Sequence, residues 1–280
     1  MSKRLLGSHQ QAPATLRPPA GRAPETLAYG EGVTETDVTL PLLPDADFAR
    51  VLCVVAHPDD MEYGASAAVS TWTRRGVEVA YLLLTSGEAG MQTPPEEVGP
   101  LRAAEQQAAC DAVGVSKLTI LDHPDGMLVY GLDLRRDIAR AVREFRPDAV
   151  ITAEYEVEAY GGLNQADHRA AGMATIDAVR DADNNWVFRE LVDEGLTKWH
   201  TKCLLIAGSS RPTHAVPVDA DAVAASVRSL ECHEAYLADL PNHPKPAEFI
   251  PEILREGGAT AGTEHAVTFR AYDLGGLGGE

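Results

Sequence analysis

The sequence predicts an α/β protein in three layers, with helices on both faces of a mainly parallel β-sheet. Between about residues 50 and 182, short apolar runs rich in β-branched residues alternate with longer segments of helical character. Several apolar runs are nearly continuous rather than alternating with polar residues, as expected for strands that are covered on both faces. Alternation of strands and helices at this spacing favours parallel βαβ units with right-handed crossovers.

Sequence signals place the expected elements in order along the chain. The expected strands are residues 50–56, 77–85, 117–121, 149–153, 202–207, 215–218 and 267–272. The expected helices are residues 65–75, 101–113, 132–145, 166–182, 186–196 and 221–233. Gly114 suits the end of the second helix and Pro147 the end of the third, whereas Asp219 suits the start of the last.

The first part of the chain differs in composition from the rest. Residues 1–44 are rich in Pro, Ala, Gly and Arg and show no helical or strand period. We predict an N-terminal extension there, followed by a single domain over residues 45–280. Residues 1–22 contain no continuous apolar core, so we expect no secretory signal.

Composition and charge exclude several classes of function. The chain is 45% hydrophobic and 24% charged, which is ordinary for a globular protein. Its formal net charge of -18 repels phosphate backbones, so we expect no nucleic-acid partner. The four cysteines are widely spaced and form no disulfide framework, and no apolar stretch is long enough to span a bilayer. We therefore expect a cytoplasmic protein. The sequence does not decide whether it is a monomer or a homo-oligomer.

Polar side chains gather where the first predicted strand ends. His57, Asp59, Asp60 and Glu62 follow the apolar run at residues 51–56. In an open α/β sheet, ligands bind outside the carboxyl ends of strands, where a strand passes into a helix. His57 and Asp60 could supply a nitrogen and an oxygen to one metal ion, which leaves Asp59 free for proton transfer. Taken alone, the same residues could also form a simple turn.

A third ligand should come from the end of another strand, and His168 is the best candidate. It follows the strand at 149–153 and begins the next helix, whose N-terminus disfavours a protonated imidazole. Asp167 beside it could orient a ligand from outside the coordination sphere, although it could also simply start the helix. Two histidines and one carboxylate leave coordination positions open for water or substrate.

Two other functions are considered for the same strand end, an iron oxygenase and a dinucleotide-binding protein. Two histidines and one carboxylate also suit Fe(II), so a non-haem iron oxygenase is an alternative. A dinucleotide-binding site is disfavoured, because the turn at residues 56–64 lacks the spaced glycines that let a backbone approach pyrophosphate.

These residues also carry a resemblance to a known family. The segment 56–60, Ala-His-Pro-Asp-Asp, with Glu62 and Gly64, looks like the first motif of the zinc-dependent PIG-L/LmbE-like de-N-acetylases. Three other segments resemble further parts of that family: residues 84–90, Arg102 with Glu105, and residues 167–170, Asp-His-Arg-Ala. The resemblance runs from about residue 51 to residue 233, including Arg-Pro-Thr-His at 211–214.

The resemblance implies a Rossmann-like fold and a metal-dependent amidohydrolase. It implies Zn²⁺, or another divalent metal, held by His57, Asp60 and His168, with Asp59 as the general base. The expected reaction removes an acetyl group from the nitrogen of an N-acetylated amino sugar or sugar conjugate by attack of metal-activated water. Relatives that cleave larger acyl groups from linear amides remain an alternative.

One position departs from the family pattern. The family motif His-x-Asp-His would place a histidine where this chain has Gln165. A glutamine amide can donate a hydrogen bond to an oxyanion but cannot carry a proton to the leaving nitrogen. We hypothesise that Gln165 retains only the electrostatic role. His123, His214 and Tyr160 are candidate substitutes, and a weakly active or non-catalytic binding protein is a second alternative.

Four further residues are candidates for contacts with substrate: Arg102, Glu88, Asp125 and His214. Each also has a simpler interpretation. Arg102 could pair with Glu105 on its own helix, Glu88 could be a solvated loop residue, and Asp125 could belong to a turn.

Overall fold

The computed structural model describes residues 39–277, and its centre is a seven-stranded sheet in the order β3-β2-β1-β4-β7-β9-β8. The strands are β1 (Arg50–Val55), β2 (Glu78–Leu83), β3 (Lys117–Ile120), β4 (Ala149–Ala153), β7 (Cys203–Ala207), β8 (His214–Pro217) and β9 (Ala266–Asp273). The first five of these pair in parallel, whereas β9 runs antiparallel to both β7 and β8. The predicted α/β, Rossmann-like fold with a mainly parallel sheet is therefore confirmed.

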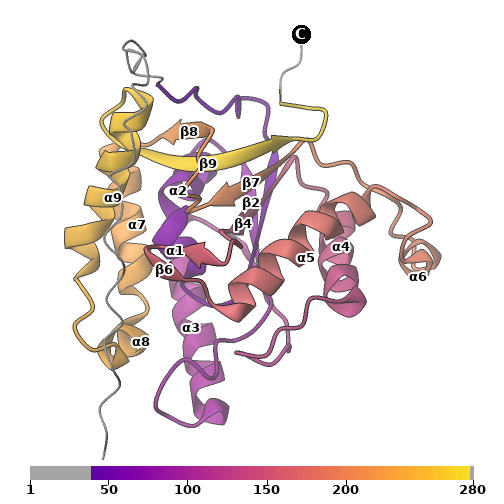
Figure 1. Cartoon of the computed structure of the whole chain (residues 1–280), viewed down its shortest axis with the longest axis horizontal. Coiled ribbons are helices and arrows are strands. Elements are labelled where there is room, and N and C mark those ends of the chain that lie inside the picture. The colour runs from indigo at the N-terminus through magenta and orange to yellow at the C-terminus, as the bar shows by residue number, and fades with distance from the viewer. Residues whose placement is uncertain (1–38, 278–280) are drawn as a thin grey trace, which may run out of the picture. The chain divides into compact units, whose positions relative to one another are not determined.

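Helices cover both faces of this sheet, which makes three layers (Figure 1). One face carries α2 (Ser66–Arg74), α3 (Pro95–Val113), α7 (Ala220–Glu231) and α9 (Pro246–Ala261), and the other carries α4 (Leu132–Phe145), α5 (Ala166–Ala182) and α6 (Arg189–Asp193). Strand β1 is buried on both faces, which explains why its sequence is almost entirely apolar. Val51, Cys53 and Val55 belong to the core under the first group of helices, whereas Leu52 and Val54 belong to the core under the second.

The strand order reverses between β1 and β4, which are neighbours in the sheet. From β1 the chain proceeds outward to β2 and β3, and then returns to the other side of β1 for β4 and β7. The segments that follow β1 and β4 leave the sheet at this reversal on opposite sides. A crevice at the carboxyl ends of the strands is the usual result, and it is the common ligand site of such sheets.

Several elements differ from the sequence predictions. Helix α3 begins at Pro95 rather than at residue 101, because proline is well suited to the first helical turn. The helix tolerates Pro100, whose missing N–H leaves the carbonyl of Glu96 without its helical partner. The helix expected at residues 186–196 is limited to α6. Four short elements were not predicted: α1 (Asp60–Gly64), α8 (Glu234–Asp239), and the hairpin of β5 (Glu158–Ala159) and β6 (Gly162–Leu163).

Helix α9 was also not predicted, because Pro251 and the pair Gly257–Gly258 are typical helix breakers. The structure gives the glycines a packing role. A Cβ on Gly257 would overlap the carbonyl oxygen of Ala266, and a Cβ on Gly258 would lie 2.6 Å from the carbonyl oxygen of Glu264. The two glycines therefore let the backbone of α9 touch the backbone that leads into β9.

The segment before residue 45 joins the folded body. Leu42 forms an isolated bridge with Ala215 of β8, Leu43 is buried, and the backbone N–H of Leu40 donates to the carbonyl of Thr260. The rest of the predicted N-terminal extension, residues 1–38, lies outside the described residues. Within the described region, every helix is too short or too polar to cross a membrane.

Candidate metal centre

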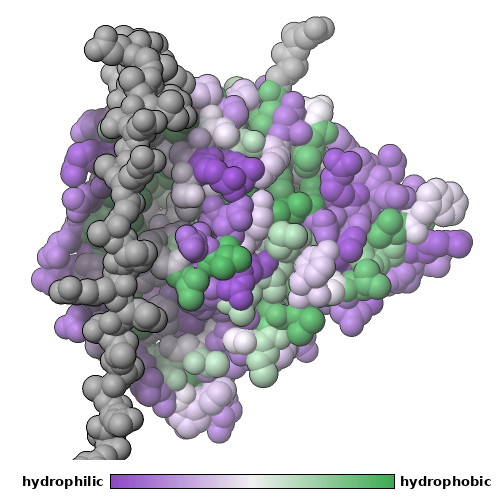
Figure 2. Space-filling view, in the orientation of Figure 1, coloured by the Kyte–Doolittle hydropathy of each residue, from purple (hydrophilic) through white to green (hydrophobic). Residues whose placement is uncertain are grey.

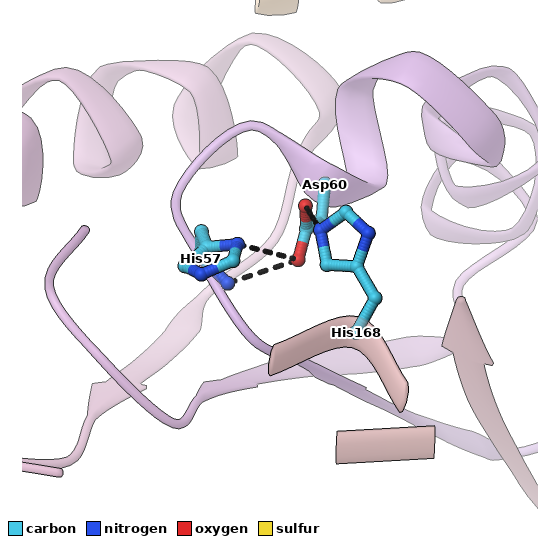
Figure 3. Close-up of side chains that lie close together, drawn as sticks. All are labelled: His57, Asp60 and His168. Carbon is cyan, nitrogen blue, oxygen red and sulfur yellow. Dashed lines mark hydrogen bonds and ion pairs between the residues drawn. The ribbon is translucent and has the colours of Figure 1, made fainter. Parts of the chain in front are cut away.

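Three side chains from two distant segments converge at the reversal of the sheet (Figure 3). His57 and Asp60 follow β1, and His168 lies in the first turn of α5, after β4. The Nε2 atom of His168 is 3.0 Å from Oδ1 of Asp60, and Nδ1 of His57 is 3.7 Å from Oδ2 of the same carboxylate. The backbone N–H of His57 also donates to Asp60 Oδ2 at 2.9 Å. The structure thus brings together the three residues that the sequence singled out as metal ligands.

The orientation of the His168 ring is set by Asn164, which sequence reasoning missed. Nδ1 of His168 lies 3.0 Å from Oδ1 of Asn164. The amide nitrogen of Asn164 donates to the carbonyls of Glu154 and Glu156, at 2.8 and 3.0 Å, so its oxygen must accept from His168. Asn164 therefore keeps a proton on Nδ1, and Nε2, beside Asp60, is the ring nitrogen left to bind a metal once it loses its own proton. The only sequence signal was an amide residue one helical turn before His168.

The His57 ring is held from its other side by two buried carboxylates. Its Nε2 atom is 3.0 Å from Oδ1 of Asp125 and 3.5 Å from Oδ2 of Asp167. Asp167 accepts the backbone N–H groups of Gly126 and Leu128, at 2.7 and 3.1 Å, so it also fixes the loop that carries Asp125. With Nε2 bound to these carboxylates, Nδ1 is the ring nitrogen that faces Asp60.

Two of the expected substrate contacts have other roles in the structure. Asp125, which was expected to touch substrate, bonds to His57 and accepts the backbone N–H of Ala89 at 2.8 Å. Glu88 accepts the backbone N–H of Asp125 at 2.8 Å and the hydroxyl of Ser86 at 2.8 Å. Both residues therefore join the loops after β2 and β3 into one wall behind His57.

The carboxylates around His57 and His168 favour a positive charge at this point. Burial alone would lower the pKa of His57, but its bonds with Asp125, Asp167 and Asp60 raise that pKa to about 12. For His168 burial also lowers the pKa, and the charge of Asp60 outweighs it so that the pKa is raised. Two imidazole nitrogens and a carboxylate oxygen are a donor set that suits a divalent transition metal. The residues therefore fit the metal that the sequence implies.

Asp59 lies beside this cluster but outside the ligand group. Its backbone is left-handed, with φ of 85°. That conformation is held by the side chain of Gln106, whose Oε1 accepts the Asp59 N–H at 2.9 Å. Burial raises the pKa of Asp59 to about 7, although the charge of Arg102 opposes that rise. A buried carboxyl that titrates near neutrality is suited to accept and return a proton.

Arg102 lies behind the loop that carries Asp59 and does not line the cavity in front of it. Its guanidinium donates to the carbonyls of Pro58 and Gly87, at 2.7 and 3.0 Å, and lies 3.3 Å from Oδ1 of Asp59. A Cβ on Gly87 would overlap this guanidinium, so glycine is needed there. Arg102 does not pair with Glu105, which instead accepts the backbone N–H of Ala235 at 2.6 Å.

A cavity of about 380 Å³ opens in front of the cluster. Asp59, Asp60, His168 and Gln165 open into it, and its walls include Tyr63, Tyr160, Tyr236 and Ile253. Gln165 is exposed and precedes α5 as its N-cap, so it does not share a helix face with His168. Tyr160 is the only one of the three candidate substitutes that lines this cavity. His123 pairs with Asp137 instead, and His214 lies in β8 beside Thr213.

A fully buried histidine, His233, lies near Glu62 and does not line the cavity. Neither ring nitrogen of His233 has a hydrogen-bond partner among the residues that the structure describes. The nearest charged oxygen, Oε2 of Glu62, is 3.9 Å from its Nε2. Burial lowers the pKa of His233 to about 3, and the charge of Arg102 adds to this. The imidazole therefore stays neutral in the folded chain across the ordinary pH range.

Replacing His233 with leucine should make the protein less sensitive to acid. The unfolded chain binds a proton at this histidine below about pH 6.5, whereas the folded chain does so only near pH 3, so folded stability falls as pH decreases across this window. We expect wild type to lose about 1.4 kcal/mol per pH unit relative to His233→Leu between about pH 6 and pH 4. Urea unfolding at several pH values measures this difference. The exposed His200, replaced with glutamine, is the control, and parallel curves for wild type and His233→Leu would contradict the prediction.

Parts of this chain are similar in sequence to known proteins. The PIG-L family model, described as GlcNAc-PI de-N-acetylase, matches residues 52–179. A diacetylchitobiose deacetylase of Thermococcus kodakarensis is 29% identical over 195 residues, which cover 69% of this chain and 72% of the relative. A probable N-acetyl-α-D-glucosaminyl L-malate deacetylase 2 of Bacillus anthracis is 32% identical over 145 residues, which cover 49% of this chain and 62% of the relative. The chain thus spans less than two thirds of the Bacillus protein.

A solved structure shares the fold. The N,N'-diacetylchitobiose deacetylase from Pyrococcus horikoshii superposes with a TM-score of 0.74 at 23% identity, covering 82% of this chain and 86% of that chain. The matched family region contains the whole convergent cluster, from His57 to His168. Residues 52–179, which contain this cluster, are therefore similar to the PIG-L family of de-N-acetylases.

Proposed function

We propose that this protein is a metal-dependent deacetylase that hydrolyses the acetamide of an N-acetylated amino sugar or sugar conjugate. The observation that carries the proposal is the convergence of His57, Asp60 and His168 while Asp59 stays outside that group and lines the same cavity. Two relatives are named as deacetylases of diacetylchitobiose and of N-acetyl-α-D-glucosaminyl L-malate, which supports the substrate class.

The ligand set favours Zn²⁺, held by His57, Asp60 and His168, because zinc combines imidazole nitrogen and carboxylate oxygen at sites with open positions. When bound, such a cation lowers the pKa of water and polarises a carbonyl group. Asn164 and Asp125 hold the two imidazole rings in place, each through the ring nitrogen that does not face Asp60. That support keeps both ligands oriented before metal and substrate arrive.

Asp59 moves the proton. As the water oxygen forms a bond with the acetyl carbon, the Asp59 carboxylate accepts the water proton. When the carbon–nitrogen bond breaks, Asp59 delivers that proton to the amine nitrogen, and the acetyl group leaves as acetic acid, which gives the second water proton to the solvent. Its pKa near 7 suits both directions of transfer at neutral pH. Gln165, at the cavity wall, can donate a hydrogen bond to the acetyl oxygen but cannot supply a second proton.

The proposal is tested by loading the purified chain with Zn²⁺ or Fe²⁺ and measuring acetate and free amine released from N-acetylglucosamine and N,N'-diacetylchitobiose. We expect release with zinc and none after chelation. Oxygen consumption with iron, without acetate release, would instead indicate an oxygenase. Bound metal without amine release from any amide would indicate a binding protein, and either result would contradict the proposal.

Replacing Gln165 with histidine should speed the reaction. An imidazole at the cavity wall could protonate the leaving nitrogen, a role for which general acids typically contribute 10²- to 10⁴-fold. We expect a gain in kcat of about tenfold, since Asp59 already supplies one proton. We also expect an alkaline limb in the pH–rate profile where the new imidazole loses its proton. The exposed Gln107→His on α3 is the control, and an unchanged rate and pH profile would refute the assigned role of Gln165.

A further inference from the structure

The motif pair Arg102 and Glu105 holds the short helix α8, which lies beside α3 (Figure 1). Oε1 of Glu105 accepts the backbone N–H of Ala235, in the first turn of α8, at 2.6 Å. The guanidinium carbon of Arg102, one turn away on α3, lies 3.9 Å from the centroid of the Tyr236 ring, which is a close cation–π contact. Both residues of the pair therefore fix the position of Tyr236, which belongs to none of the motifs described above.

Tyr236 lines the cavity in front of the metal centre, and its hydroxyl bonds to the Asp59 side chain. Burial raises the pKa of this phenol, and the charge of Asp59 and the hydrogen bond to its side chain raise it further. The phenol therefore keeps its proton at neutral pH and donates to the carboxylate. Arg102 lies 3.3 Å from Oδ1 of the same carboxylate, so the residue that stacks on the Tyr236 ring also contacts Asp59.

The other two tyrosines of the cavity wall face different groups. The Tyr63 hydroxyl lies 2.7 Å from Nε2 of His243. Tyr160 stands at the turn between β5 and β6, in a region whose surface is apolar where Figure 1 places β6. The exposed apolar side chains of this hairpin region, seen in Figure 2, include Val157 and Leu163. Of the three tyrosines, Tyr236 is thus the one bonded to the general base.

The contacts of Asp59 restrict the orientation of its carboxylate from several sides. Gln106 accepts the backbone N–H, Arg102 contacts Oδ1 from behind the loop, and Tyr236 bonds from the cavity side. A carboxylate that must accept a proton from one water molecule works best when it is held in a single orientation, because small displacements of a reacting group are costly. Of these three groups, Tyr236 is the one that lines the cavity.

We propose that Tyr236 is a positioning residue for the reaction, whose hydroxyl orients the Asp59 carboxylate toward the attacking water. Arg102 and Glu105 hold α8 so that this hydroxyl stays in place. The inference rests on the proposed deacetylase function of the same site. It also gives the pair on α3 a role, although neither member of the pair lines the cavity.

The first test is Tyr236→Phe in the zinc-loaded full chain, which keeps the ring on Arg102 and removes only the hydroxyl. We expect kcat for acetate release from N,N'-diacetylchitobiose to fall about tenfold with KM changed by less than about twofold, since a misoriented base weakens the transition state and not substrate binding. In an Asp59→Asn background the same change should cost less than about twofold, because Tyr236 acts through Asp59. Tyr130→Phe, whose hydroxyl donates to Asp177 outside the cavity, should retain the kcat of wild type.

The outcomes of this test separate the two proposals. An unchanged kcat in Tyr236→Phe, or an equal fold-loss in the wild-type and Asp59→Asn backgrounds, would overturn the inference while the deacetylase function stands. Absence of acetate release from every sugar by the wild-type chain would overturn the proposed function, and this inference with it.

The second test loosens α8 without changing Tyr236. Glu105→Leu removes the acceptor of the Ala235 N–H and should lower kcat about tenfold, whereas Glu105→Gln retains an acceptor oxygen and should stay within about twofold of wild type. Glu97→Leu, at an exposed position of α3, is the control and should keep the kcat of wild type. Equal kcat values in Glu105→Leu and Glu105→Gln would overturn the part assigned to α8.

Unfolding of the metal-free chain tests the hydrogen bond without relying on activity. At pH 8, Tyr236→Phe should lower the midpoint of urea unfolding more than Tyr130→Phe does, because a hydrogen bond to a buried carboxylate stabilises a fold more than one to an exposed carboxylate. Equal midpoints in these two variants would overturn the inference.

Discussion

Asparagine in place of Asp59 is expected to lower kcat for acetate release by about 10²- to 10⁴-fold, the usual cost of removing a general base. Asparagine has nearly the same shape and tolerates the left-handed backbone that Asp59 adopts, so the loop should keep its conformation. Because Asp59 lies outside the ligand group, metal stoichiometry should be unchanged. Steady-state kinetics, with metal analysis of the same samples, measures both quantities.

The control for this variant is Asp133→Asn, an exposed aspartate in the first turn of α4. It should retain the kcat of wild type. Asp59→Asn with kcat within a few-fold of wild type would show that another group accepts the proton. A loss of metal in Asp59→Asn would show that Asp59 supports the metal centre and would contradict its separate role.

Asp60→Asn should nearly abolish metal binding and, with it, acetate release. The Asp60 carboxylate lies between the two imidazole rings and is the only acidic member of the convergent ligand group. Its pKa is lowered, since the charge of His168 and the bonds to both histidines outweigh the effect of burial, so it presents an anion at neutral pH. An amide of the same shape lacks that charge. The loss of metal affinity should exceed the roughly 10- to 100-fold that removal of a supporting residue causes.

Asp125→Asn provides the matched comparison, because Asp125 contacts His57 from the side away from Asp60. We expect metal affinity to fall about 10- to 100-fold in this variant, with part of the activity recovered at high metal concentration. Titration of the chelated protein with Zn²⁺ measures both variants. Similar affinities for Asp60→Asn and wild type would place the metal elsewhere, and no effect of Asp125→Asn would deny it a supporting role.

The sequence predicted the site best where several polar side chains directly follow a buried strand. The buried strand before His57 is apolar on both faces, and the acidic residues directly after it can only lie at the end of that strand. His168 could be paired with them because parallel strands bring their carboxyl ends to one edge. The fold class follows from the same alternation of strands and helices, so the parallel sheet and most helices could be predicted.

The rest depends on contacts between residues that are far apart in sequence. The positive charge of Arg102 made it a candidate for binding substrate. Only the fold shows that its guanidinium instead donates hydrogen bonds to the carbonyls of Pro58 and Gly87. Asn164 lies in a polar loop, and its place one turn before His168 does not by itself reveal that its amide orients that ring. Helix α9 carries a proline and two adjacent glycines, which local propensity counts against a helix. Each case is decided by tertiary packing rather than by local preference.

The glycine pair in α9 has a consequence for how this protein could diversify. Main chain meets main chain at Gly257 and Gly258, with no side chain between to absorb a change. A larger residue at either position would push α9 away from the backbone before β9. Because Ile253 lies about one turn earlier on the same helix, it would move with α9. The width of the site entrance could then change without any substitution near the catalytic groups, which separates the evolution of selectivity from that of reactivity.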